Sequence, residues 1–233
     1  MVQNGFVFFW LSVIAKEESM ALKINEIFYS IQGESLYAGV PCVFVRLSGC
    51  NLRCSYCDTG YAYTHGVLME RDEVMEMISR NSCPIVEITG GEPLVQEETP
   101  LLIASLLDTG KTVLLETNGS MRIDLVDKRC VRIVDMKCPS SGESAKNDLE
   151  NLNRLSMKDQ LKFVIADRDD FEFAASLVKR VPSNFPTENI LFSPVWGRLA
   201  PSILADYILE TKLQVRLQIQ LHKILWPDRD RGV

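Results

Sequence analysis

Short apolar runs alternate with amphipathic segments along the chain from residue 20 onward. After a short run at 24–28, seven apolar runs predict strands, at 41–47, 84–89, 112–116, 131–135, 161–165, 189–192 and 214–221, and the run 84–89 is β-branched enough for a buried strand. Helical segments are expected between several of these runs, at 71–80, 99–107, 145–155, 169–181 and in a helix opened by 200–202. The pattern therefore predicts that strands and helices alternate throughout.

Such alternation favours one α/β domain with a parallel sheet. Consecutive strands of this kind run parallel and are joined by right-handed crossovers. About seven strands are fewer than the eight that close a full barrel, so we expect an incomplete parallel (β/α) barrel of the TIM type. The length of 233 residues suits a single domain, which we place at 20–233.

Polar and glycine-rich segments follow the predicted strands, at 50–59, 90–93, 117–119, 137–142 and 193–197. Because the carboxyl ends of parallel strands meet at one rim of the sheet, we expect these segments to form the functional site. The strand predicted at 214–221 should bring the tail, 226–233, to the same rim. We therefore expect the tail to close over a bound substrate.

Residues 1–19 do not share this pattern. Their apolar run, 5–15, is too short to span a bilayer, has no preceding Lys or Arg, and leads into Lys16 without a small-residue cleavage site. It predicts neither a membrane anchor nor a signal peptide. We expect residues 1–19 to be a non-essential extension that precedes Met20.

Composition narrows the classes of partner and compartment. A net charge of −6 argues against a broad phosphate-binding face, so we expect a small-molecule substrate rather than nucleic acid. Seven cysteines, odd in number and unpatterned outside one loop, suit a reducing compartment better than a disulfide framework. These features indicate a cytoplasmic protein without membrane attachment.

The strongest chemical signal is the loop 50–57, which spaces Cys50, Cys54 and Cys57 as C-x3-C-x2-C. Three such thiolates can bind three irons of a four-iron cluster and leave the fourth iron open. Zinc sites usually pair cysteines as C-x2-C, and ferredoxins add a fourth cysteine soon after the third. The alternative, three small buried hydrophobes, fits poorly because the loop is otherwise polar.

This spacing, followed by Asp58 and Thr59, resembles the signature of the radical S-adenosylmethionine (SAM) superfamily. The resemblance implies a 4Fe-4S cluster whose open iron binds SAM, and an external electron donor such as flavodoxin or ferredoxin. The segment 89–93, Thr-Gly-Gly-Glu-Pro, is similar to the superfamily's segment that holds the SAM amino group. Alone, these glycines would indicate only a tight turn after a strand.

Further segments resemble the 7-carboxy-7-deazaguanine synthase family, at 25–28, 31–34, 39–41, 44–47, 49–50, 57–59, 218–223 and 231–233. The resemblance covers nearly all of the chain from Met20. It implies conversion of 6-carboxy-5,6,7,8-tetrahydropterin to 7-carboxy-7-deazaguanine with loss of ammonia, in queuosine biosynthesis. It also implies recycled SAM, Mg²⁺ and a homodimer.

The same resemblance assigns roles to individual residues. It implies iron ligation by Cys50, Cys54 and Cys57, and magnesium ligation by Thr59. Pterin contacts are implied at Ile31, Gln32, Gly33, Glu34, Arg46 and Thr89. SAM contacts are implied at Tyr56, Cys57, Asp58, Gly91, Asp135, Met136, Lys137, Ser193, Pro194 and Val195. Some family members carry Ser-Pro-Lys where this chain has 135–137.

The chemistry of these side chains agrees with the implied roles. The planar guanidinium of Arg46 suits a substrate carboxylate, and Gln32 and Glu34 can pair with the amide and amine edge of a pterin. Tyr56 could lie near adenine, and Asp58 could accept a hydrogen bond. Simpler explanations exist too: Arg46 could pair with a surface acid, and Glu34 could cap a helix.

Two other functions are compatible with the cysteine spacing. A glycyl-radical activating enzyme has a similar size and the same motif but acts on a large protein; the Gln-Gly-Glu segment at 32–34 and the end at 231–233 argue against it. A non-enzymatic iron-sulfur or zinc module would take a fourth ligand from Cys42, His65 or Cys138.

Overall fold

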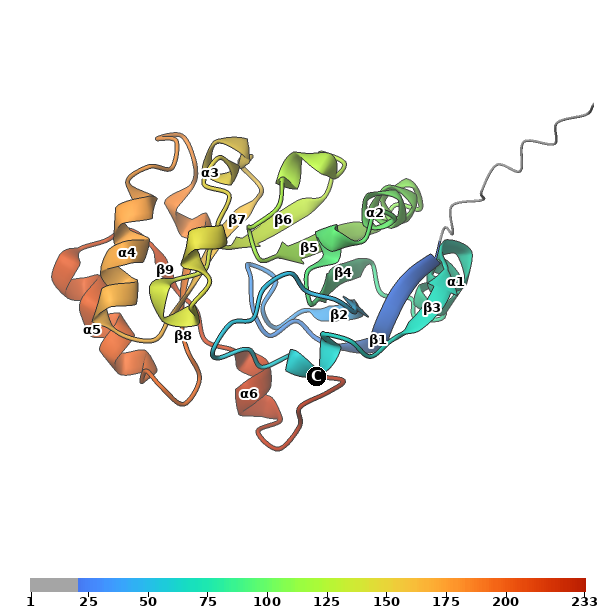
Figure 1. Ribbon diagram of the computed structural model, residues 1–233, viewed down its shortest axis with the longest axis horizontal. Coiled ribbons are helices and arrows are strands. Elements are labelled where there is room, and N and C mark those ends of the chain that lie inside the picture. Colours follow the sequence, from blue (N-terminus) through green and yellow to red (C-terminus); the bar gives the residue numbers. More distant parts are fainter. Residues whose placement is uncertain (1–20) are drawn as a thin grey trace, which may run out of the picture.

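The computed structural model describes residues 21–233, which form one open, curved sheet with helices around its outside (Figure 1). The expectations for residues 1–19 lie outside the described residues. Within 21–233, no helix is long and apolar enough to cross a membrane.

The sheet of the described chain has nine strands in the order β3-β1-β2-β4-β5-β6-β7-β8-β9. Their bounds are β1 Ala21–Ile31, β2 Pro41–Leu47, β3 Val67–Glu70, β4 Ile85–Gly90, β5 Thr112–Thr117, β6 Val131–Asp135, β7 Gln160–Ile165, β8 Ile190–Pro194 and β9 Arg216–Leu217. The helices are α1 Arg71–Ser79, α2 Thr99–Asp108, α3 Asn151–Arg154, α4 Arg168–Val178, α5 Pro201–Thr211 and α6 Leu221–Leu225.

In the sheet order, β2 and the strands from β4 to β9 pair in parallel. The sheet does not close, which confirms the predicted partial barrel. The two strands before them in the sheet order differ from the expectation. β1 is antiparallel to β2 and to β3, and β3 was not predicted. The connection at 32–40 is too short for a crossover helix, so β1 and β2 can pair only as antiparallel neighbours.

The helix expected at 145–155 is mostly absent. Only a 3₁₀ turn, Ser144–Lys146, and the short α3 form there. The amide of Asn147 bonds both the N–H and the C=O of Lys137, and Asn151 donates to the carbonyls of Gly119 and Met121. These side chains hold neighbouring loops, and such local bonds compete with regular helix formation.

The strand expected at 214–221 is reduced to β9, and α6 begins at Leu221. The Leu221 N–H donates to Gly33 O at 2.9 Å, and the Gln220 amide donates to the Glu34 carboxylate at 2.9 Å. The chain therefore leaves the sheet to contact the loop after β1.

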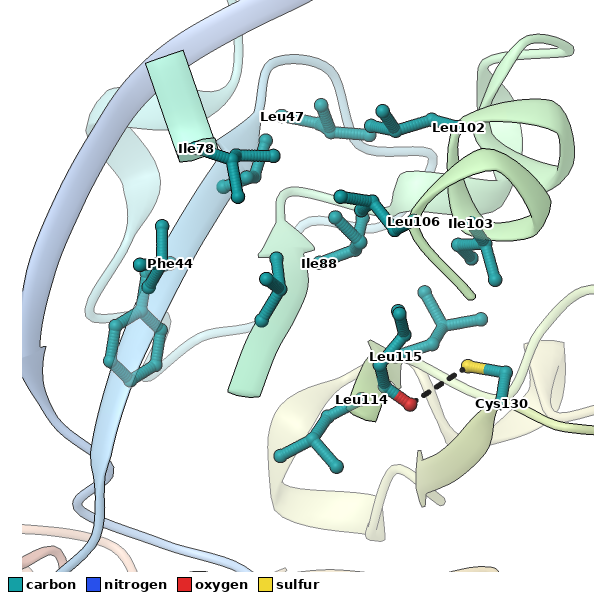
Figure 2. Packing of buried hydrophobic residues seen from close by; sticks show 14 of the residues in the cluster. Phe44, Leu47, Ile78, Ile88, Leu102, Ile103, Leu106, Leu114, Leu115 and Cys130 are labelled. Carbon is teal, nitrogen blue, oxygen red and sulfur yellow. Dashed lines mark hydrogen bonds between the residues drawn. The ribbon is translucent and has the colours of Figure 1, made fainter. Parts of the chain in front are cut away.

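Two apolar clusters hold the helices against the sheet. In the first, Leu102, Ile103 and Leu106 form one stripe of α2 that faces Ile88 and Leu115 of the sheet (Figure 2). In the second, the fully buried rings of Phe163, Phe171 and Phe192 meet edge to face, with centroids 5.5 and 5.7 Å apart. Both clusters fix strand positions and so the rim where the strands end.

A buried ion pair ties β6 to the start of β7. The carboxylate of Asp159, which has no exposed surface, accepts hydrogen bonds from the guanidinium of Arg132 and from the N–H and hydroxyl of Ser156. Removing one partner of such a pair leaves the other charge buried without compensation.

We therefore expect Asp159→Ala to lower the free energy of unfolding by about 3–5 kcal/mol. Asp108→Ala removes an exposed carboxylate from its pair with Arg129 and should cost at most about 1 kcal/mol. Urea denaturation of both variants measures the difference. Equal losses in the two variants would contradict the importance given to the buried pair.

Candidate active site

One cavity of about 530 Å³ opens at the rim where the parallel strands end. Its wall includes the loops after β1, β2, β4 and β5, together with the chain's last residue, Val233. The cavity therefore draws together segments from both ends of the described chain.

Most of the predicted site residues line this cavity. They are Ile31, Gln32, Gly33, Glu34, Arg46, Cys50, Cys54, Tyr56, Cys57, Asp58, Thr59, Thr89, Gly91, Asp135, Lys137 and Val195. Met136, Ser193 and Pro194 are buried and do not line it. Met136 packs in the apolar cluster instead, so the roles of these three residues stay predictions.

Cys50 and Cys54 are partly exposed, Cys57 is exposed, and all three line the same cavity. The Leu52 N–H lies 3.4 Å from Cys50 Sγ, and the Asn118 amide nitrogen lies 3.8 Å from it. Burial raises the pKa of Cys50 and of Cys54. A bound metal would offset this cost, because its charge favours the thiolate.

The three thiols line one cavity, as the ligands of a four-iron cluster would. Within residues 21–233, no three His, Cys, Asp or Glu side chains are gathered so that they could hold a metal ion. A four-iron cluster instead takes each cysteine on a different iron, so its ligands need to be spread around one space. Cys42 and Cys138 are fully buried away from the cavity, and His65 does not line it, so the fourth ligands considered for a zinc module lie elsewhere.

Hydrogen bonds from a neighbouring loop fix the cysteine loop from outside. The Arg53 N–H donates to the Glu143 carboxylate at 2.7 Å, and the Ser55 N–H donates to Ser141 O at 3.0 Å. The Arg53 guanidinium donates back to the carbonyls of Cys50 and Leu52 at 2.8 and 2.7 Å. These hydrogen bonds hold the loop that carries the three cysteine sulfurs in one conformation.

The glycines after β4 let two loops touch through their backbones. A Cβ on Gly91 would lie 2.0 Å from Gly49 O, and the Glu92 N–H donates to that same oxygen at 2.8 Å. Gly90 has a φ of 134°, a conformation that favours glycine. The glycine pair therefore has a structural role beside the predicted contact with SAM.

Glu92 extends this connection to the loop after β5. Its fully buried carboxylate accepts hydrogen bonds from the Thr117 hydroxyl at 2.8 Å and from the Asn118 N–H at 2.6 Å. Three rim loops are thereby held together. The sequence motif alone does not predict this role for Glu92, because its partners come from a distant loop.

A second part of the wall carries Asp135, Lys137 and Tyr56. Lys137 Nζ lies 2.8 Å from Asp135 Oδ2, whereas the buried Oδ1 has no hydrogen-bond partner within the described chain. Burial opposes the charge of Lys137, but Asp135 outweighs it and raises the pKa of the lysine. A free carboxylate oxygen here suits a ligand with N–H or O–H donors, as SAM has.

Four charged residues meet on the opposite wall: Glu34, Glu87, Glu116 and Lys162. Lys162 is ion-paired with Glu34 and lies 2.7 Å from Glu116 Oε1. Burial opposes ionisation of Glu34, but Lys162 outweighs it and lowers the pKa of Glu34 to about 2. Glu34 caps no helix, so that simpler explanation does not apply.

Sequence reasoning missed Glu87, Glu116 and Lys162. Each lies inside an apolar run that was correctly predicted as a strand. A charged residue in the middle of a buried strand is costly unless it is paired or faces a cavity. The presence of charged residues within predicted buried strands was therefore the sequence feature that could have identified these three site residues.

Arg46 faces the cavity and also pairs with an acid. Its Nε donates to Glu26 Oε1 at 2.7 Å, and the guanidinium lies 5.9 Å from the ring centre of Tyr61. Within residues 21–233, its two terminal nitrogens make no hydrogen bond, so they can still bind a planar anion.

The tail packs on the site. Lys223 Nζ lies 3.5 Å from Asp58 Oδ2, and the Arg231 guanidinium lies 4.2 Å from the ring centre of Tyr61. Figure 1 shows the C-terminus beside the segment that follows β2. The expected placement of the tail at the rim is thus observed, although a helix rather than a strand leads into it.

We expect Gly91→Ala to lower the free energy of unfolding by about 1–3 kcal/mol and to reduce iron incorporation, because the added methyl group meets backbone. Gly60→Ala is the matched control, since its Cβ would only make ordinary contact with Tyr63 at 3.5 Å. Urea denaturation and iron assay measure both effects. Normal stability and iron content in Gly91→Ala would contradict the close packing.

Comparison with known proteins places the chain in a family. The model of the radical SAM superfamily matches residues 44–136. The chain is 41% identical to a 7-carboxy-7-deazaguanine synthase of Koribacter versatilis, over 91% of this chain and 100% of that protein. It is 44% identical to a protein of the same name from Chlorobaculum tepidum, over 91% of this chain and 97% of that one.

The fold is shared with a solved structure at lower identity. The crystal structure of QueE from Escherichia coli superposes with a TM-score of 0.68 at 21% identity, over 87% of this chain and 95% of that chain. Sequence similarity to the named relatives and this shared fold agree with the cysteine loop on the cavity wall. The chain therefore belongs to the 7-carboxy-7-deazaguanine synthase family of the radical SAM superfamily.

Proposed function

We propose that the protein converts 6-carboxy-5,6,7,8-tetrahydropterin to 7-carboxy-7-deazaguanine with loss of ammonia, in queuosine biosynthesis. The observation that carries the proposal is that the cysteine loop and the implied pterin residues line one cavity. Relatives 38% to 44% identical to the chain bear the name of this synthase. The cavity is of a size for small molecules rather than for a protein substrate.

In this proposal Cys50, Cys54 and Cys57 hold the 4Fe-4S cluster. A cluster bound there would supply one electron for cleavage of SAM into methionine and a 5′-deoxyadenosyl radical. The unpartnered Oδ1 of Asp135 accepts a hydrogen bond from SAM, and the backbone of Gly91 contacts SAM. Met136, Ser193 and Pro194 have buried side chains and would contribute backbone atoms only.

The pterin residues of the opposite wall bind and orient the substrate. Arg46 receives the carboxylate on its free terminal nitrogens. Glu34, kept ionised by Lys162, accepts from ring N–H groups, and Gln32 lies beside it. Ile31, Gly33 and Thr89 complete this part of the wall.

Magnesium would bind at Thr59, whose hydroxyl is a hard but weak oxygen donor beside the cysteine loop. Such a donor cannot hold Mg²⁺ alone, so substrate oxygens and water must complete the octahedron. Magnesium binding is then linked to substrate binding.

We infer the remaining partners from the chemistry of the site and the chain. The cluster needs an external one-electron donor, such as flavodoxin or ferredoxin. All seven cysteines are free, which suits the cytoplasm, and the net charge of −6 disfavours nucleic acid. Family membership supports a homodimer.

Anaerobic incubation with SAM, a reductant, Mg²⁺ and the carboxypterin tests the proposal. We expect 7-carboxy-7-deazaguanine and ammonia to form while the SAM concentration stays nearly constant. Cleavage of SAM without any change in the carboxypterin would overturn the assignment of the substrate.

Cys54→Ala should lose most of its iron and its SAM cleavage, because two thiolates cannot hold a site-differentiated cluster. Cys83→Ala, which removes a buried thiol outside the cavity, should keep both. Iron assay and detection of 5′-deoxyadenosine compare the variants. Production of 5′-deoxyadenosine by Cys54→Ala at the rate of the unmodified protein would refute the ligand assignment.

Thr59→Ala should raise the magnesium concentration for half-maximal turnover roughly tenfold, as expected for one lost weak ligand. Iron content should not change, since Thr59 is not a cluster ligand. Turnover measured across a magnesium titration checks the effect, with Thr59→Ser as the control that keeps the hydroxyl. An unaltered magnesium response would count against the site.

A further inference from the structure

Glu87 lies on the inner face of β4, one step deeper than the rim. In the parallel pairing Arg46 is opposite Thr89, and Phe44 is opposite Glu87. Because alternate residues of a strand share a face, Glu87 and Thr89 both face the cavity, with Glu87 further from the strand end. Only 2% of Glu87 is exposed. It is therefore a nearly buried acid at the cavity floor.

Gln32 is the one hydrogen-bond partner of the Glu87 carboxyl within residues 21–233. Gln32 Nε2 donates to Glu87 Oε2. The orientation of that amide is settled, because its Oε1 accepts the Glu34 N–H at 2.8 Å. Glu87 lines the cavity, and its Oε1 makes no hydrogen bond in the described chain. It is free to bind a ligand.

Within residues 21–233, Glu87 forms no ion pair, although Lys162 and Arg46 favour its charged form from a distance. Lys162 is held between Glu34 and Glu116, and Arg46 is paired with Glu26. A buried carboxyl beside two other acids and without its own cation favours the neutral form. Burial, Glu116 and Glu34 together raise the pKa of Glu87 well above its ordinary value.

We propose that Glu87 is a neutral carboxylic acid that donates a hydrogen bond from Oε1 to the lactam carbonyl oxygen of the substrate ring, and so determines specificity. The proposal rests on the proposed function. Since Oε2 accepts from Gln32, the proton belongs on Oε1. Glu34 is ionised and can only accept hydrogen bonds. Glu34 therefore binds the N–H of the substrate amide, whereas Glu87 binds its C=O.

Infrared difference spectroscopy of the substrate-free protein tests the protonation state. At pH 7, Glu87→Gln should remove a carbonyl band of a protonated carboxylic acid. Glu34→Gln, the matched control on the same wall, should remove carboxylate absorption instead. Loss of carboxylate absorption in Glu87→Gln would overturn the proposal. This measurement uses no substrate and is independent of the proposed function.

Turnover of two substrates tests the hydrogen bond. The probes are the carboxypterin and its analogue with an amino group in place of the lactam oxygen. Glu87→Leu should lower kcat/KM for the carboxypterin roughly tenfold to a hundredfold, because a hydrogen bond is lost, and should change the analogue far less. Glu87→Gln, which keeps an N–H donor, should lose less than Glu87→Leu.

Equal losses on both substrates would show a merely structural role and overturn the proposal. Iron content reports whether each variant folds. If the unmodified protein turns over neither compound, the proposed function fails, whereas the infrared result still decides whether Glu87 is neutral.

Discussion

The site depends on one backbone contact, between the cysteine loop and the glycine loop after β4. Gly49 O accepts the Glu92 N–H, and no side chain fits between that oxygen and Gly91. The Glu92 carboxylate then holds the Thr117 and Asn118 loop. Because parallel strands bring their ends to one rim, a single close approach of this kind can connect three loops. These hydrogen bonds fix the cysteine loop relative to the ends of the strands, and so determine where the three cysteines lie.

The second constraint is the balance of buried charge. Three glutamates face the cavity beside one lysine, so the lysine can neutralise at most part of their charge. In a poorly solvated wall, the neutral form of a carboxyl without a cation is favoured, whereas Lys162 lowers the pKa of Glu34 and keeps it ionised. Chemically identical side chains thus acquire different hydrogen-bonding roles. Position relative to Lys162 decides which glutamate accepts and which donates.

The fold could be predicted from sequence because its determinants are local. Apolar runs and helical spacing identify strands such as β4 and helices such as α2, and parallel order then places the loops at one rim. Determinants that act at a distance were missed. β1 is antiparallel because its connection to β2 is short. The helix expected near Asn147 and Asn151 does not form because the side chains of these residues hydrogen-bond to other loops. The family resemblance identified most of the site residues. The pairing of Lys162 with Glu34 and Glu116 depends on how distant strands pack, so the sequence did not predict it.

The substrate wall is joined by residues far apart in the chain. Gln218 donates to Ser35 O at 3.0 Å, Leu221 to Gly33 O at 2.9 Å, and Gln220 to Glu34 at 2.9 Å. Bringing together segments so far apart costs conformational entropy, which these hydrogen bonds and the packing around them must offset. The cysteine loop is likewise held by residues far along the chain, Glu143 and Ser141. Both the cysteine loop and the wall beside Glu34 therefore depend on contacts that only the complete fold can make.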